Sequence, residues 1–231
     1  MSFPEPLEAS RILSPRAHSL LTAQSASRVG LAGRADQPTR PSGPRTGLLG
    51  GSFNPAHGGH RRISLFALEA LGLDEVWWLV SPGNPLKPKE GMAPLHARYA
   101  SAIKMARRAP IRATTIEREL GTRYTIDTIE ALQTRYPRRE FVWLMGSDNL
   151  AQFHKWKAWR RIAWRLPIAV IARPGYEMAT VASPAAAMLR RFRMDAAQFA
   201  NRGEWSAPTL VTLRFDPDDR SATAIRAGEP D

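Results

Sequence analysis

The sequence predicts an α/β fold with a doubly wound, mostly parallel sheet that carries helices on both faces. From Thr46 onward, short apolar runs alternate with longer amphipathic segments. This alternation is typical of strands and crossover helices in a parallel sheet. Strands are expected at Gly47–Leu49, Glu75–Val80, Ile111–Ile116, Phe141–Met145, Pro167–Ala172 and Leu210–Phe215, and helices at Gly59–Leu71, Pro94–Arg108, Thr125–Arg135 and Asn149–Trp164.

The ends of the expected helices carry residues that favour helix termini. Gly72 follows the first helix at the position of a C-terminal glycine cap. Pro94 suits the first turn of the second helix, because a helix start leaves its N–H groups unpaired and proline has none. Thr125 is a candidate cap for the third helix, and Asp127 and Glu130 would lie near its positive end. Ligands of such sheets bind beyond the carboxyl ends of the strands, near the point where the strand order reverses.

The composition fits one domain with a normal core. The chain has 231 residues, of which 43% are hydrophobic. It contains no cysteine, which excludes disulfides, thiolate metal ligands and a thiol nucleophile, and which suits a reducing cytoplasm. No apolar run approaches the roughly 20 residues that a membrane span requires. We therefore expect a cytoplasmic protein that does not enter a membrane.

Residues 1–45 differ from the rest of the chain. They are rich in Ser, Pro, Arg and Ala and show no sustained hydrophobic period, so we expect a disordered N-terminal extension. Their Arg- and Ser-rich, acid-poor character is also similar to an organelle transit peptide, although a solvated tail or an upstream start-site extension is the favoured interpretation. The folded domain is expected to span residues 46–231.

The net charge of +12 indicates an anionic partner. Nucleic acid is one candidate class, and phosphorylated small molecules satisfy the same electrostatics. The arginines are scattered, and no zinc finger, RNA-recognition aromatic motif or basic zipper is present. Charge alone leaves both classes open.

The segment GGSFNPAHGGH, residues 50–60, is the strongest local signal for a functional site. The glycine pairs at 50–51 and 58–59 let the backbone bend and approach a ligand closely. His57 and His60 are three residues apart, so they would project from neighbouring positions at the start of a helix. A helix N-terminus favours an anion, and two imidazoles there can donate hydrogen bonds to one phosphate group. The segment therefore predicts a phosphate-handling loop.

Other chemistries fit this segment less well. A histidine zinc site has spacing i and i+4 with a Glu between, or cysteines, and neither occurs here. Ser52 does not stand in the G-x-S-x-G pattern of a nucleophile elbow. Neither a Walker A loop nor a GxGxxG fingerprint is present. His18, His96 and His154 are expected to have no special role.

Several motifs resemble one family. GGSFNPAHGGH resembles the G-x-F-x-P-x-H-x-G-H signature of the nucleotidyltransferase superfamily, and SATAIR (221–226) is similar to its second signature, IST-x-x-R. VSPGNPLKPK, TRYTIDTIEAL, WLMGSDNLAQFHKW and IARPGY narrow the resemblance to the bacterial nicotinate-nucleotide adenylyltransferases. The resemblance covers roughly residues 46–226 and implies a Rossmann-like nucleotidyltransferase fold.

The resemblance implies roles for the residues that match these motifs. The residues implied to act on the ATP phosphates as catalytic groups are His57, His60, Lys87 and Arg226. Those implied to bind the rest of ATP are Gly50, Gly51, Ser52, Phe53, Gly146, Asp148, Ser221 and Thr223. Those implied to bind the nicotinate nucleotide are Tyr124, Thr125, Trp156 and Arg173. The amides of Tyr124 and Thr125 would meet the nicotinate carboxylate, and Trp156 would stack on the pyridine ring.

Two of these residues have structural alternatives in the sequence itself. Trp156 is as well suited to packing as to ring stacking, and Asp148 is also a candidate cap for the helix after the fourth strand. Trp77, Trp78 and Trp143 are expected to lie in the core.

The implied reaction transfers an adenylyl group from ATP to nicotinate mononucleotide and yields deamido-NAD and pyrophosphate. Magnesium is the expected cofactor, held mainly by substrate phosphates rather than by a dedicated protein site. The expected partners are ATP and nicotinate mononucleotide, with neither nucleic acid nor a membrane, and the oligomeric state stays open. The alternatives are another nucleotidyltransferase, which uses nicotinamide mononucleotide or phosphopantetheine, and a nucleic-acid-binding protein.

The chain departs from the family pattern at two places. Leu86 stands where the family's lysine loop has a histidine, and Lys89 is a candidate substitute for that donor. The family continues past its second signature with a closing helix, whereas this sequence ends five residues after Arg226. The C-terminal helix is therefore expected to be truncated.

Overall fold

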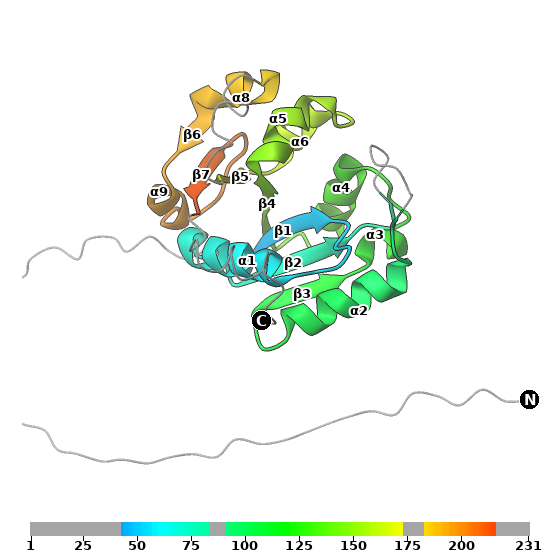
Figure 1. Cartoon of the computed structure of the whole chain (residues 1–231). Helices are drawn as coiled ribbons and strands as arrows, with labels where there is room; N and C mark the ends of the chain where they lie inside the picture. Colours follow the sequence, from blue (N-terminus) through cyan, green and yellow to red (C-terminus); the bar gives the residue numbers. More distant parts are fainter. Residues whose placement is uncertain (1–42, 84–90, 173–182, 216–231) are drawn as a thin grey trace, which may run out of the picture. The chain divides into compact units, whose positions relative to one another are not determined.

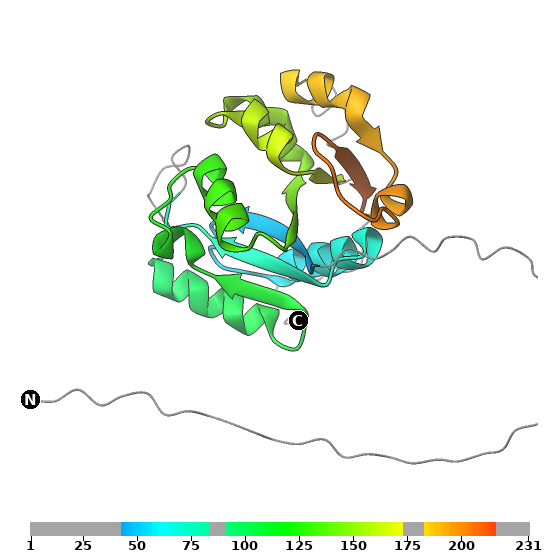
Figure 2. The same cartoon turned by 180° about the vertical axis from the view of Figure 1, so that it is seen from behind.

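A parallel sheet of seven strands forms the centre of the part of the chain that the computed structural model describes, residues 43–83, 91–172 and 183–215. The strand order is β3-β2-β1-β4-β5-β7-β6, and every neighbouring pair is parallel. The strands are β1 (Arg45–Gly51), β2 (Glu75–Val80), β3 (Ile111–Thr114), β4 (Glu140–Gly146), β5 (Ile168–Ala172), β6 (Arg193–Met194) and β7 (Leu210–Arg214). Figure 1 shows the sheet with its helices, and Figure 2 shows it from behind.

Two hydrophobic clusters cover the two faces of the sheet. Successive strand residues point to opposite faces, so Leu48 and Trp77 belong to one cluster while Leu49 and Trp78 belong to the other. The first cluster takes side chains from α4 (Thr125–Arg135), α5 (Ser147–Gln152), α6 (Trp159–Arg165) and α8 (Pro184–Leu189). The second takes them from α1 (Gly58–Leu71), α2 (Leu95–Ala106) and α9 (Ala196–Ala200). The predicted doubly wound sheet with helices on both faces is confirmed.

The strand order reverses between β1 and β4. From β1 the chain adds β2 and β3 on one side, and it then returns to place β4 on the other side of β1. Loops that leave the carboxyl ends of β1 and β4 therefore diverge and leave a crevice between them. The segment at residues 50–60 follows β1, and Gly146 ends β4. Both segments thus lie at the switch point.

The predicted single helix at Asn149–Trp164 is wrong. The segment forms α5, the 3₁₀ helix η1 (Phe153–Lys155) and α6, with Trp156 in an extended conformation and Ala158 at φ 50 between them. Phe153 contacts Trp156 and Trp159 at ring-centroid distances of 5.3 and 5.9 Å. The three rings pack together where the helical segment is interrupted.

Smaller corrections concern element ends. The third strand stops at Thr114, whose hydroxyl accepts a hydrogen bond from the Ile116 N–H at 3.1 Å, so the predicted end of the strand belongs to α3 (Ile116–Glu119). Pro94, Tyr124 and Gly146 occupy the N-cap positions of α2, α4 and α5. Thr125 and Asp148 therefore do not cap their helices, and Pro94 precedes its first turn. Gly72 caps α1 in the left-handed conformation, as predicted.

The folded part begins slightly earlier than Thr46. Arg45 is the first residue of β1, is 3% exposed and hydrogen-bonds to Glu140, so it belongs to the sheet rather than to an extension. The expectation for residues 1–42 lies outside the described ranges. Within those ranges, none of the helices is both long and apolar enough to cross a bilayer.

Candidate active site

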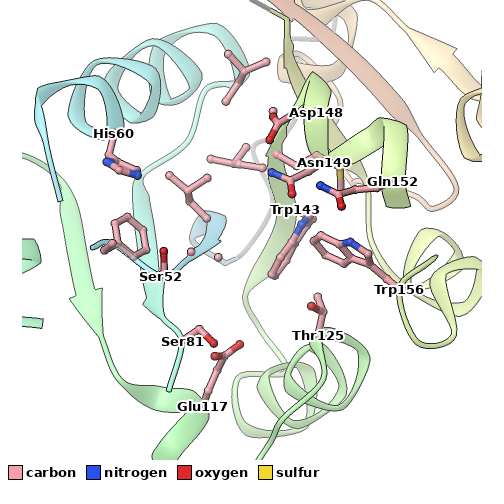
Figure 3. A pocket seen from close by; sticks show the side chains of 18 of the residues that line it. Ser52, His60, Ser81, Glu117, Thr125, Trp143, Asp148, Asn149, Gln152 and Trp156 are labelled. Carbon is pink, nitrogen blue, oxygen red and sulfur yellow. The ribbon is translucent and has the colours of Figure 1, made fainter. Parts of the chain in front are cut away.

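A cavity of about 780 Å³ opens at the carboxyl ends of β1 and β4. Figure 3 shows Ser52 and His60 on one wall, facing Asp148, Asn149, Gln152 and Trp156, with Glu117 and Thr125 at the lower end. Eleven sequence-predicted site residues line this cavity: Gly50, Gly51, Ser52, Phe53, His57, His60, Tyr124, Thr125, Gly146, Asp148 and Trp156. They come from β1, α1, α4, β4, α5 and the turn before α6. The fold thus brings together motifs that are about 100 residues apart.

The two histidines of the glycine-rich loop lie in contact at the start of α1. His57 is the N-cap residue, and its backbone N–H donates to Nδ1 of His60 at 3.3 Å. A ring nitrogen that accepts a hydrogen bond carries no proton, so the neutral imidazole of His60 carries its proton on Nε2. The ring centroids are 3.9 Å apart. A Cβ at Gly59 would lie 2.9 Å from the His57 ring, so this packing requires glycine there.

Phe53 holds the loop beneath the histidines. Its ring is 1% exposed, stacks on Trp78 with centroids 5.1 Å apart and lies 4.9 Å from the ring of His60. Its φ of 47 is in the left-handed region, which is costly for a bulky residue. Burial of the ring therefore fixes a backbone turn that the chain would not adopt by itself.

The opposite wall is built where β4 passes into α5. Asp148 is exposed to the cavity, and its carboxylate folds back over Gly146, where an added Cβ would lie only 2.4 Å from Oδ1. Asn149 and Gln152 project from α5 beside it (Figure 3). This wall offers acceptors and amide groups, which suit hydroxyl and amino groups of a ligand.

The N-terminus of α4 closes a third side. The first-turn N–H groups of a helix have no acceptor within the helix, so the start of α4 at Tyr124 and Thr125 favours an anion. Lys157, in the turn before α6, contacts the N-terminal end of α4. Its Nζ lies 3.1 Å from Oδ2 of Asp127 and 4.3 Å from the ring centroid of Tyr124.

Trp156 is half-buried and lines the cavity while it packs edge-on against Phe153 and Trp143. The position of Trp156 is therefore compatible both with a packing role and with ligand contact. Trp143 lies in the core as predicted, being 3% exposed, and Trp77 and Trp78 do too. Trp143 also lines the cavity, and its buried Nε1 has no hydrogen-bond partner among the described residues. The sequence predicts Trp143 in the core alone, because a single tryptophan among seven is ordinarily a core residue.

Glu117 is a cavity residue that sequence reasoning missed. It is 9% exposed, lies on α3 and is hydrogen-bonded through its side chain to Ser81 and Thr128. Burial raises the pKa of this carboxyl to about 7, and the two hydrogen bonds lower it in part. The available sequence signal was an acid directly after a segment that was itself expected to be strand.

The cavity lining favours anionic ligands. Arg123, Lys155 and Lys157 lie along it, whereas Glu117 and Asp148 are the carboxylates among its described residues. Near neutral pH, protonation of Glu117 removes part of that negative charge. Within the described ranges, no cluster of three or more His, Asp or Glu side chains is arranged to hold a metal ion.

Five predicted site residues lie outside the described ranges: Lys87, Arg173, Ser221, Thr223 and Arg226. Their roles remain predictions from the motifs, as does the contribution of Leu86 and Lys89. The expected truncation of the C-terminal helix also concerns residues beyond 215.

Comparison with known proteins gives the family. A family model described as cytidylyltransferase-like matches residues 48–228. A probable nicotinate-nucleotide adenylyltransferase of Erythrobacter litoralis is 74% identical over 187 residues, which are 81% of this chain and 85% of that protein. A protein of the same description from Parvibaculum lavamentivorans is 52% identical over 80% of this chain and 92% of its own length.

A solved structure supports the fold independently. The nicotinic acid mononucleotide adenylyltransferase of Plasmodium falciparum, complexed with NaAD, matches with a TM-score of 0.55 over 74% of this chain and 75% of its own. At 14% identity this likeness concerns the fold alone. The family model and the two relatives lead to one assignment: the chain belongs to the nicotinate-nucleotide adenylyltransferases of the cytidylyltransferase-like family.

Proposed function

We propose that this protein transfers the adenylyl group of ATP to nicotinate mononucleotide, giving deamido-NAD and pyrophosphate. The observation that supports this most is the cavity at the switch point, where motif residues from separate segments meet. The cysteine-free chain suits the cytoplasm, where we expect the reaction to take place.

The chemistry requires little beyond positioning and charge stabilisation. A phosphate oxygen of the mononucleotide attacks the α-phosphorus of ATP, and the bond from that phosphorus to the bridging oxygen of pyrophosphate breaks. The attacking monoester is largely a dianion near neutral pH, since its second pKa is about 6, so no general base is needed. The protein's part is to align the two phosphates and to stabilise the charge that develops between them.

The walls of the cavity have different roles in this reaction. His57 and His60 reach the triphosphate from the start of α1, and Nε2–H of His60 donates to the α-phosphate as charge builds there. Asp148 accepts hydrogen bonds from the adenosine. The N-terminus of α4, together with Arg123, meets the nicotinate carboxylate.

Magnesium fits this site as a companion of the substrate phosphates. The cavity offers Asp148 as an exposed carboxylate but no cluster of acids among its described residues, and magnesium favours oxygen ligands that include substrate phosphates. The ion would supply charge neutralisation of the leaving pyrophosphate. Substrate phosphates would hold the ion, and Asp148 is the alternative protein ligand, to be distinguished from its role toward the adenosine.

The test is pyrophosphate release from ATP with separate acceptors: nicotinate mononucleotide, nicotinamide mononucleotide and phosphopantetheine. The proposal expects turnover that is at least about tenfold more efficient with the acid than with the amide, because an anion is met by unpaired N–H groups and by cations. Equal efficiency with the amide would contradict the choice of acceptor. No release with any of the three would contradict the activity itself.

A further inference from the structure

Arg98 of α2 is a buried arginine just outside the cavity. Its side chain is 2% exposed, and Arg98 is not among the residues that line the cavity. The guanidinium group hydrogen-bonds to main-chain carbonyl oxygens: Nη1 donates to Ser52 at 2.6 Å and to Ser81 at 2.9 Å, and Nε donates to Ala93 at 2.9 Å. A longer bond of 3.5 Å joins Nη2 to Pro82. No carboxylate of a described residue pairs with it.

The carbonyls belong to three segments that meet behind the cavity. Ser52 follows β1, Ser81 and Pro82 follow β2, and Ala93 precedes α2. One planar group thus ties together the ends of two neighbouring parallel strands and the start of a helix. Arginine suits this task because its five donors lie in a rigid fork, whereas lysine offers one point charge.

The bond to Ser52 also orients the peptide that follows. In a trans peptide the N–H points opposite to the C=O, so a Ser52 carbonyl turned toward Arg98 sends the Phe53 N–H away from α2. This is the peptide that leads into the left-handed conformation of Phe53. Arg98 therefore supports the backbone geometry directly beneath the two histidines.

Three further hydrogen bonds fix the same loop to α2 and to the segment before it. Asn54 accepts from the Ala93 N–H at 3.1 Å and donates to Gly91 at 3.0 Å. The Ala56 N–H donates to the hydroxyl of Ser101 at 3.2 Å. Alternate residues of the loop are thus anchored, and Arg98 supplies the anchor nearest to β1.

We propose that Arg98 is a positioning residue for the ATP phosphates: it holds the loop of residues 52–57 and the end of β2 in register, and its buried charge adds positive potential behind the loop without touching the nucleotide. Burial lowers the pKa of Arg98, but an arginine stays charged in proteins. A cation in a poorly solvated place acts over a longer distance than an exposed one. The inference rests on the proposed adenylyl transfer.

Arg45 supplies a matched control. It is also buried, at 3% exposure, and it donates to the main-chain carbonyls of Ala200, Arg202 and Gly203; unlike Arg98, it also pairs with a carboxylate, that of Glu140. It lies at the amino end of β1, whereas the cavity opens at the carboxyl end of that strand. Loss of either arginine should lower stability, but only loss of Arg98 should change the handling of ATP.

The experiment compares Arg98→Lys and Arg98→Met with Arg45→Lys and Arg45→Met in the full chain, by Tm and by kcat and KM for each substrate. A loop displaced by about 1 Å costs on the order of 100-fold in turnover, so Arg98→Met should lose about that much in kcat/KM for ATP. Arg98→Lys should restore less than about a tenth of the kcat/KM for ATP that Arg98→Met loses, because one ammonium group cannot replace the planar guanidinium donors. KM for the mononucleotide should change by less than about twofold in both variants, because the loop borders the triphosphate.

Two outcomes would overturn the proposal: ATP kinetics in both Arg98 variants within about twofold of wild type, or equal kinetic losses in Arg45 variants of the same Tm. If Arg98→Met does not fold, the kinetics of Arg98→Lys decide. Calorimetric titration of ATP into wild type and variants separates this inference from the proposed activity. If wild type transfers no adenylyl group, the proposed activity is refuted. In that case the ATP affinities still test the positioning role, and an affinity that Arg98→Lys leaves unchanged refutes it as well.

Discussion

Glu117 should make the stability of this protein depend on pH near neutrality. The carboxyl is 9% exposed, and burial raises its pKa from 4.5 to about 7 against the partial opposition of hydrogen bonds to Ser81 and Thr128. The folded state therefore holds this proton more tightly than the unfolded state does. Stability is greatest where both states are protonated and falls as the pH rises from about 4.5 to about 7.

The magnitude follows from that pKa difference. The step from 4.5 to about 7 corresponds to a free-energy loss on the order of 3 kcal/mol once the pH is above both values. Most of the loss, about 2.5 kcal/mol, occurs between pH 5 and pH 8. Glu117→Gln keeps a neutral side chain of nearly the same shape throughout that range, so it should not suffer this loss.

The assay is urea unfolding of wild type and Glu117→Gln at pH 5 and at pH 8. The free energy of unfolding of the variant, relative to wild type, should rise by about 2 to 3 kcal/mol between these pH values, while other carboxyls cancel in the comparison. Glu119→Gln is the control, because Glu119 lies on the same short helix and is exposed. A difference that stays constant with pH, or an equal rise in Glu119→Gln, would refute the reasoning.

Three predictions concern the cavity walls. His60→Ala should lower kcat by about 100- to 1,000-fold with Tm almost unchanged, since it removes a donor to the transition state; near-normal turnover with ATP would contradict this role. Trp156→Ala should raise KM for nicotinate mononucleotide by about tenfold while KM for ATP stays within about twofold, and equal changes in both would indicate a packing role instead. Asp148→Asn should raise KM for ATP by about tenfold, and a Mg²⁺ titration then tells whether the carboxylate serves the adenosine or the ion: a changed Mg²⁺ requirement indicates the ion.

The sheet and the histidine loop were predictable because both depend on short-range patterns. Strands such as Glu75–Val80 and Ile168–Ala172 are nearly continuous apolar runs, which parallel strands buried on both faces require. The loop at residues 50–60 combines glycines with histidines at a helix start, and its role depends on local geometry. The broken helix was not predictable in this way, because Ala158 at φ 50 follows from the packing of Trp156 and Trp159 rather than from its own side chain.

The buried charged residues at the cavity, Arg98 and Glu117, could not be recognised from local sequence. Arg98 stands in an amphipathic helix, where an arginine normally faces solvent, and Glu117 follows a segment expected to be strand, where an acid normally ends the strand. The role of each residue is visible only in the folded structure, where segments that are distant in the sequence pack against it. Their burial, at 2% and 9% exposure, is what distinguishes them from the other charged residues of α2 and α3.

Ser81 connects Arg98 and Glu117 and thereby the two halves of the site. Its carbonyl accepts from Arg98, which also holds Ser52 on the ATP side, and its side chain is hydrogen-bonded to the carboxyl of Glu117. Glu117 is bonded in turn to Thr128 in α4, the helix whose N-terminus faces the acceptor. A continuous set of hydrogen bonds therefore runs along the cavity from the phosphate loop to the acceptor wall. In-line transfer requires the two phosphates to be aligned, and a frame shared by both walls is a direct way for the fold to fix that alignment.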